Sequence, residues 1–111
     1  MKATNNIEDL PACPVATTLS LIGTKWKTLI LQQLLVKPFR FNELHSAING
    51  ISEKMLTDSL KAMTADGIVT RTVYPEVPVW VEYALSDIGE LMRPIIKSME
   101  EWSLGYKEQI K

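Results

Sequence analysis

The chain has 111 residues, of which 46% are hydrophobic and 23% charged, with a net charge of −1, so it can form one globular domain with a core but not two. It has no apolar run near the roughly 20 residues of a membrane-spanning helix and begins without the apolar stretch of a signal peptide, so we expect a cytoplasmic protein outside any membrane. One cysteine excludes an internal disulfide, and one histidine with one cysteine cannot form a zinc site within a single chain, so we expect neither metal nor cofactor.

The first residues lead into a helix that begins near the single cysteine. Residues 1–12 are expected to form a flexible arm ahead of a single domain over 13–111. Pro14 suits the first position of a helix, which places Cys13 at the N-cap. There the unpaired N–H groups and the positive end of the helix dipole would stabilise a thiolate, the form that reacts with oxidants and electrophiles. The alternative is a small, inert, buried thiol.

A second helix is predicted over 25–36, after Gly23 ends the first and Thr24 caps the next. The apolar residues on its predicted buried face are Trp26, Leu29, Ile30 and Leu34. Pro38 pushes the residue before it out of the helical conformation and so ends this helix.

Two short helices joined by a glycine-containing turn follow, which is the outline of a helix-turn-helix. The first is predicted over 40–48 and the second over 51–67, with Ser52 as its N-cap and Gly67 as its left-handed stop. The apolar face of the second helix carries Leu56, Leu60 and Met63, with Met55 at its edge, and the opposite face carries Lys54, Thr57, Asp58 and Lys61.

A hairpin is predicted next, because runs rich in β-branched and aromatic residues at 68–74 and 79–85 flank a proline-containing turn. Alternate residues of its second strand should face the core and the solvent. A helix-turn-helix followed by a hairpin is the order of a winged helix, whose second helix enters the DNA major groove. The predicted fold is mainly α with a small β-hairpin wing (α+β). Trp80, near the tip, could contact DNA or a partner, but we favour a position over the hairpin.

The acidic pI near 5.8 argues against a nucleic-acid-binding protein, but the charges are segregated. Residues 25–71 hold seven basic and four acidic side chains, whereas residues 72–111 hold four basic and seven acidic. The positive half therefore coincides with the proposed DNA-reading part, which permits DNA binding.

The C-terminal segment predicts one long helix over about 87–105, capped by Asp87 with Glu90 at the capping-box position. Pro94 should bend this helix without ending it. Its apolar stripe consists of Ile88, Leu91, Ile95, Met99, Trp102 and Tyr106. We expect the stripe to pack against a second copy in a homodimer, and the alternative is a helix folded back over the wing.

These motifs together resemble the HxlR-type branch of bacterial winged-helix regulators, which are relatives of the MarR type. In order, the matching motifs are Cys13-Pro14-Val15, Gly23-Thr24-Lys25-Trp26, Arg40-Phe41-Asn42-Glu43-Leu44, Ile51-Ser52-Glu53-Lys54-Met55-Leu56-Thr57, Asp66-Gly67-Ile68-Val69-Thr70-Arg71, Val81-Glu82-Tyr83, Gly89 and Trp102. The resemblance implies a homodimeric transcription factor that binds double-stranded DNA. It also implies that the N- and C-terminal helices join the two protomers. It also implies a recognition helix over 52–61, a wing over 71–81 and an oxidant-, quinone- or aldehyde-sensing role for Cys13. This chain departs at the wing tip, where Val79-Trp80 stand in place of a basic residue.

On this basis the DNA contacts are predicted at Arg40, Ser52, Lys54, Met55, Thr57, Lys61 and Arg71. Lys54 is the first choice for a base contact, because a cation can donate to O6 and N7 of guanine, and Thr57 and Lys61 would follow it along the groove. Ser52, Arg40 and Arg71 would hold phosphates of an inverted-repeat operator.

Two alternatives stay open, a winged-helix module that binds protein without DNA and a regulator controlled by a small apolar ligand. An enzyme is not expected, because His45 has no Cys or Ser placed for activation by it and the sequence has no phosphate-binding loop.

Overall fold

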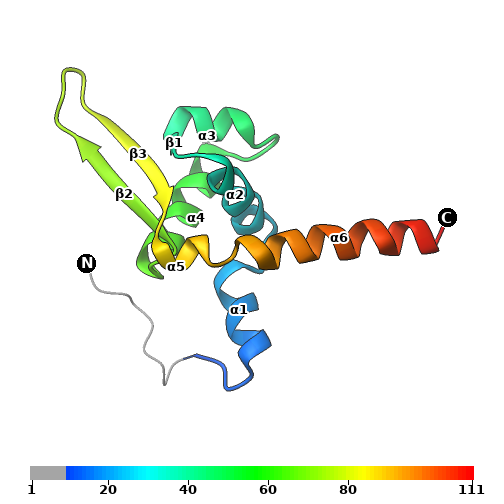
Figure 1. The fold of residues 1–111 in the computed structure, drawn as a ribbon. Coiled ribbons are helices and arrows are strands. Elements are labelled where there is room, and N and C mark those ends of the chain that lie inside the picture. Colours follow the sequence, from blue (N-terminus) through cyan, green and yellow to red (C-terminus); the bar gives the residue numbers. More distant parts are fainter. Residues whose placement is uncertain (1–9) are drawn as a thin grey trace.

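Helices, a small sheet and a protruding C-terminal helix share one core in the computed structural model, which describes residues 10–111 (Figure 1). The elements in order are α1 (Pro14–Ile22), α2 (Lys25–Val36), β1 (Phe39–Arg40), α3 (Phe41–Ala47), α4 (Glu53–Ala65), β2 (Val69–Tyr74), β3 (Trp80–Leu85), α5 (Asp87–Glu90) and α6 (Arg93–Gln109). This arrangement confirms the predicted winged helix-turn-helix. The expected arm over 1–12 lies almost wholly outside the described residues.

The predicted caps set the start of two helices. The Thr24 side chain accepts a hydrogen bond from the backbone N–H of Lys27 at 3.2 Å, and Ser52 Oγ accepts one from Met55 N–H at 3.0 Å. Each bond pairs a donor that the first turn of a helix leaves free. Both predicted N-caps are therefore confirmed.

Two glycines make the turns at either end of α4 possible. Gly50, between α3 and α4, has φ +86°, and Gly67, after α4, has φ +80°. A side chain is disfavoured at such angles, so glycine is the natural residue at both positions. The predicted left-handed stop at Gly67 is confirmed.

The core lies where α2, α3 and α4 meet the sheet. The largest side chains that are fully buried are Ile30, Leu31, Leu44, Leu56, Leu60 and Met63. Burial of one face of α4 therefore fixes which of its residues point outward.

The sheet has three strands in the order β1-β3-β2, all antiparallel, so the prediction of a two-stranded hairpin missed a strand. The two-residue strand β1 pairs Phe39 with Tyr83 and Arg40 with Glu82. Tyr83 and Leu85 of β3 pack against the core, as the predicted alternation requires. Because β3 is the central strand, however, all six of its residues are partly buried, so none of its side chains is fully exposed to solvent. Strand β1 also ties the start of α3 to the wing.

The single helix predicted over 87–105 is two helices, α5 and α6, separated at residues 91–92. The cap of α5 is Ser86, whose Oγ accepts a hydrogen bond from Gly89 N–H at 3.1 Å, so the prediction of Asp87 was wrong. Pro94 lies in the first turn of α6, where its missing N–H costs no hydrogen bond, so it starts a helix and does not bend one. Helix α6 then extends away from the rest of the molecule (Figure 1).

Candidate nucleic-acid interface

The outward face of α4 carries a polar stripe. With Leu56 and Leu60 buried, Lys54, Thr57 and Lys61 are exposed at spacings of three and four residues, which places them on one side of the helix. Met55 lies at the edge of this stripe and is 42% exposed. The structure thus brings together the four residues of this helix that were predicted to contact DNA, and their role stays a prediction.

An acidic side chain lies within this stripe. Lys54 Nζ donates a hydrogen bond to Asp58 Oδ2 at 2.8 Å, and both groups are exposed. This hydrogen bond and the opposite charge raise the pKa of Lys54 and lower the pKa of Asp58, and the charge of Lys61 lowers the latter further. Lys54 would have to exchange Asp58 for a DNA acceptor. The spacing of four residues signalled this pair, but the sequence-based site left Asp58 out.

A groove separates α4 from the wing. Its walls are formed by Thr57, Leu60, Lys61, Thr64 and Ala65 of α4 and by Arg71 and Tyr83 of the sheet. Lys61 and Arg71 therefore supply one cation from each wall. The hydroxyl of Thr64 is buried and has no hydrogen-bond partner among the described residues.

Arg40 and Trp80 come together at the wing. The Arg40 guanidinium carbon lies 4.0 Å from the centroid of the Trp80 ring, and that ring stacks on Tyr74 with centroids 4.0 Å apart. Trp80 therefore lies over the hairpin, as predicted.

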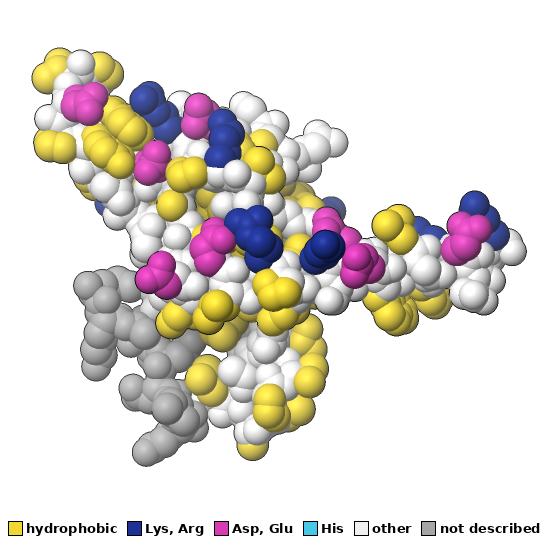
Figure 2. Space-filling model, in the orientation of Figure 1, with side chains coloured by type: hydrophobic (Ala, Val, Ile, Leu, Met, Phe, Trp, Pro, Cys, Tyr) yellow, Lys and Arg dark blue, Asp and Glu magenta, His cyan; other side chains and the backbone are white. Residues whose placement is uncertain are grey.

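The wing surface around this stack is acidic. The charge of Glu82 raises the pKa of Tyr74, with further contributions from burial, a hydrogen bond to Glu82 and the charge of Glu76. On the face seen in Figure 2, the wing at the upper left carries mainly hydrophobic side chains together with acidic ones. The wing tip itself thus offers no cation to DNA.

The single cysteine is accessible. Cys13 is the N-cap residue of α1, as predicted, and its side chain is exposed, so the alternative of a buried thiol is wrong for the described chain. Val15 and Leu19 of the same helix are exposed as well.

An apolar surface extends over α1, α5 and α6 and is visible around the lower side of the molecule in Figure 2. Its exposed members are Val15, Leu19, Ile88, Leu91, Ile95, Met99, Trp102, Tyr106 and Ile110. In α6 only Ile96 is buried. Exposed apolar patches of this kind mark interaction surfaces.

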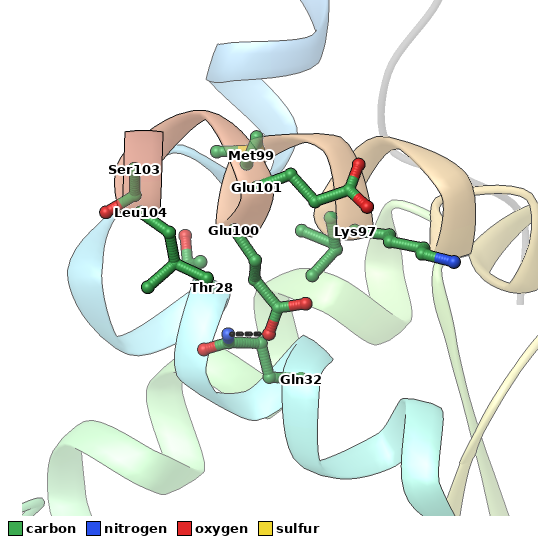
Figure 3. A pocket seen from close by; sticks show the side chains of 9 residues that line it. Thr28, Gln32, Lys97, Met99, Glu100, Glu101, Ser103 and Leu104 are labelled. Carbon is green, nitrogen blue, oxygen red and sulfur yellow. Dashed lines mark hydrogen bonds between the residues drawn. The ribbon is translucent and has the colours of Figure 1, made fainter. Parts of the chain in front are cut away.

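A hollow lies where α6 passes over α2 (Figure 3). Thr28 and Gln32 of α2 face Leu104 and Glu100 of α6 across it, and Gln32 Nε2 donates to a Glu100 carboxylate oxygen at 3.5 Å (Figure 3). Its lining mixes apolar with charged groups and adjoins the apolar surface of α6.

Within residues 10–111, no three His, Cys, Asp or Glu side chains are grouped so that they could hold a metal ion. No helix in that part of the chain is long and apolar enough to cross a bilayer.

Residues 21–111 match the model of a family described as "HxlR-like helix-turn-helix". The HTH-type transcriptional regulator YdeP of Bacillus subtilis (strain 168) is 41% identical over 103 residues, which are 93% of this chain and 80% of that protein.

Solved structures are similar as well. The structure described as "Redox regulator HypR in its oxidized form" is 42% identical with a TM-score of 0.78, and the match covers 84% of this chain and 96% of that one. The diamide-treated YodB of B. subtilis is 37% identical with a TM-score of 0.73, and the match covers 85% and 94%.

Proposed function

Because the chain belongs to the HxlR-like helix-turn-helix family of transcriptional regulators, we propose that it acts as a homodimer that binds an inverted-repeat operator through α4. The observation that carries this proposal is the exposed stripe of Lys54, Thr57 and Lys61 on a helix whose other face is buried in the core. A helix held in this way can enter a major groove without unfolding its own domain.

The contacts fall into two classes. Lys54 reads a base, with Thr57 and Lys61 further along the groove and Met55 at its edge. Phosphates are held by Ser52 at the start of α4, by Arg71 on the wing and by Arg40 at the start of α3. Two such surfaces in a dimer meet successive major grooves about 34 Å apart.

The apolar surface of α1, α5 and α6 supports the dimer. Most of α6 lies outside the core. The rings of its Trp102 and Tyr106 stack with their centroids 5.2 Å apart, and both side chains are exposed. A second copy would remove this surface from water and would fix the separation of the two α4 helices.

The test is selection of duplexes from a random pool by the reduced protein at about 0.1 M salt, where weak binding through phosphates alone is suppressed. The expected result is an inverted repeat with half-sites about one helical turn apart. Lys54→Ala should relax the preference at one base pair of each half-site, and Lys97→Ala on α6 is the matched control, with the full preference kept. A folded protein that enriches no sequence would instead favour a winged-helix module that binds protein.

We also propose that Cys13 makes the regulator sensitive to oxidants. Its thiol is exposed at the start of α1, beside the apolar surface that we assign to the dimer. The comparison with HypR and diamide-treated YodB supports this assignment. Modification there would shift α1 and with it the spacing of the two α4 helices.

Treatment with diamide tests the disulfides that a single cysteine can form. Two Cys13 thiols of a dimer can form one disulfide, releasing two protons and two electrons that reduce diamide to its hydrazine. With a small thiol present, diamide can instead form a mixed disulfide between that thiol and Cys13. An alkyl adduct would require an electrophile such as a quinone, and a sulfenic acid would require a peroxide. Non-reducing gels and intact mass identify the product, and operator affinity should change in the parent but not in Cys13→Ser. Equal responses of the two proteins would place the switch elsewhere.

A further inference from the structure

The stack of Arg40, Trp80 and Tyr74 joins the wing to the start of α3. We propose that Trp80 is a positioning residue that holds the Arg40 guanidinium toward a DNA phosphate, so that the wing orients a cation that it does not itself carry. This inference rests on the proposed DNA-binding function. It adds that Arg40, held by Trp80, makes the phosphate contact on the side of the wing that faces away from α4.

The register of the sheet places the stack on one face. Arg40 pairs with Glu82, and Tyr74 pairs with Trp80, so these side chains lie on the same side of the sheet. Arg71 pairs with Tyr83, and both line the groove toward α4 on the other side. Each side of the sheet thus has one cation, Arg71 from β2 on the side toward α4 and Arg40 from β1 on the other.

That arrangement suits a minor groove. A wing inserted into a groove about 6 Å wide lies between two sugar–phosphate strands and meets phosphates on both sides. Arg71 serves the strand nearer α4, and Arg40 serves the other strand.

Residues 72–86 contain Glu76 and Glu82 but no lysine or arginine, so this part of the wing cannot attract a phosphate alone. Without a cation in front of them, these two carboxylates would repel the backbone. Arg40 is the cation that lies against this acidic surface.

The indole is itself held in place. Trp80 Nε1 donates a hydrogen bond to Glu76 Oε1 at 3.2 Å, and one ring face is covered by Tyr74, whose hydroxyl donates to Glu82 Oε1 at 3.3 Å. The guanidinium carbon of Arg40 lies over the Trp80 ring at 4.0 Å. The ring is therefore a fixed platform between the hairpin and Arg40.

Arg40 remains free to bind an anion. None of the ion pairs among residues 10–111 involves its guanidinium. Stacking covers one face of a guanidinium but leaves its in-plane N–H groups to donate, and a planar fork suits two phosphate oxygens. The stack thus reduces the freedom of Arg40 without using its donors.

The experiment is a double-mutant cycle on duplex affinity, measured over a series of salt concentrations with Arg40→Ala, Trp80→Ala and the double variant. Arg40→Ala loses one phosphate contact, so it should bind duplex DNA about eightfold more weakly at 0.1 M salt. The slope of log affinity against log salt concentration should become shallower by about 0.9. Trp80→Ala should weaken binding about two- to fivefold in the parent, because an exposed cation–π contact is lost, and should have no further effect in Arg40→Ala.

Trp80→Phe keeps an aromatic face and should restore most of the affinity, whereas a purely structural defect would persist. Val79→Ala is the matched control, because Val79 is an exposed wing residue next to Trp80. Additive losses in the cycle, or unchanged binding by Trp80→Ala, would overturn the positioning role alone. A parent protein that binds no duplex would remove both this inference and the proposed function.

Discussion

Asp58 lies among the cations of the proposed recognition face, and its replacement tests the electrostatics of that face. Asp58→Asn keeps the shape of the side chain and removes one negative charge. In the structure this carboxylate lies 2.8 Å from Lys54 Nζ, and the charge of Lys61 also lowers its pKa. The carboxylate therefore offsets the positive charge of Lys54 in the free protein, while Lys54 itself stays protonated.

Removal of that charge frees about one cation for a phosphate or a base. At a slope of about −0.9 per neutralised phosphate, affinity for duplex DNA should rise about eightfold at 0.1 M salt, and the salt slope should steepen by about 0.9. Fluorescence anisotropy of a labelled duplex over several salt concentrations measures both quantities.

The matched control is Glu101→Gln, which makes the same change of charge on α6. It should leave the affinity within about twofold of the parent, since exposed charges more than a Debye length apart are largely screened. Weaker binding by Asp58→Asn would refute the reasoning and would indicate that Asp58 itself accepts a hydrogen bond from a base, as an acidic side chain can from cytosine N4.

Three further predictions concern stability and ionisation. Gly67→Ala should lower the free energy of unfolding by about 1–2 kcal/mol, because φ at this position is +80°. Gly105→Ala should raise it by about 0.5–1 kcal/mol, because alanine favours the helix and its methyl group would enter open space on α6. Urea unfolding at one protein concentration measures both changes. Leu56→Ala removes a fully buried side chain and should cost about 2–5 kcal/mol in the same assay. Tyr74 should ionise above the usual pH near 10, because Glu82 raises its pKa in the folded protein. The stability that the Tyr74 hydroxyl contributes is therefore present below that usual pH and is lost as the pH rises through the raised pKa. In an absorbance titration at 295 nm, Glu82→Gln should bring the pKa of Tyr74 back toward the usual value.

Local signals were enough to predict much of this fold. The caps at Thr24 and Ser52, the stop at Gly67 and the apolar spacing of α4 each depend on residues close together in sequence, and the structure confirms them. Local chemistry also fixed Cys13 at the start of α1.

The errors have physical causes. Strand β1 has two residues and no pattern of its own, because it exists through pairing with β3 some forty residues later. The break between α5 and α6 was missed because the apolar repeat continues through Pro94, so periodicity suggested one helix where the missing N–H of proline favours a new start.

The candidate site was predictable along α4 but not across the wing. Lys54, Thr57 and Lys61 share a face by helical spacing alone. The contact between Arg40 and Trp80 joins residues forty positions apart, and the groove that brings Lys61 near Arg71 depends on how the sheet packs on α4. These long-range contacts depend on the tertiary structure, so no local sequence pattern predicts them.

In the proposed function, two copies of α4 read two major grooves of one operator. Dimethyl sulfate footprinting of a selected duplex tests it most directly, because this reagent methylates guanine N7 in the major groove. We expect two protected guanines related by two-fold symmetry and about one helical turn apart, with both protections lost in Lys54→Ala. Protection of a single half-site, or protection that survives Lys54→Ala, would contradict it.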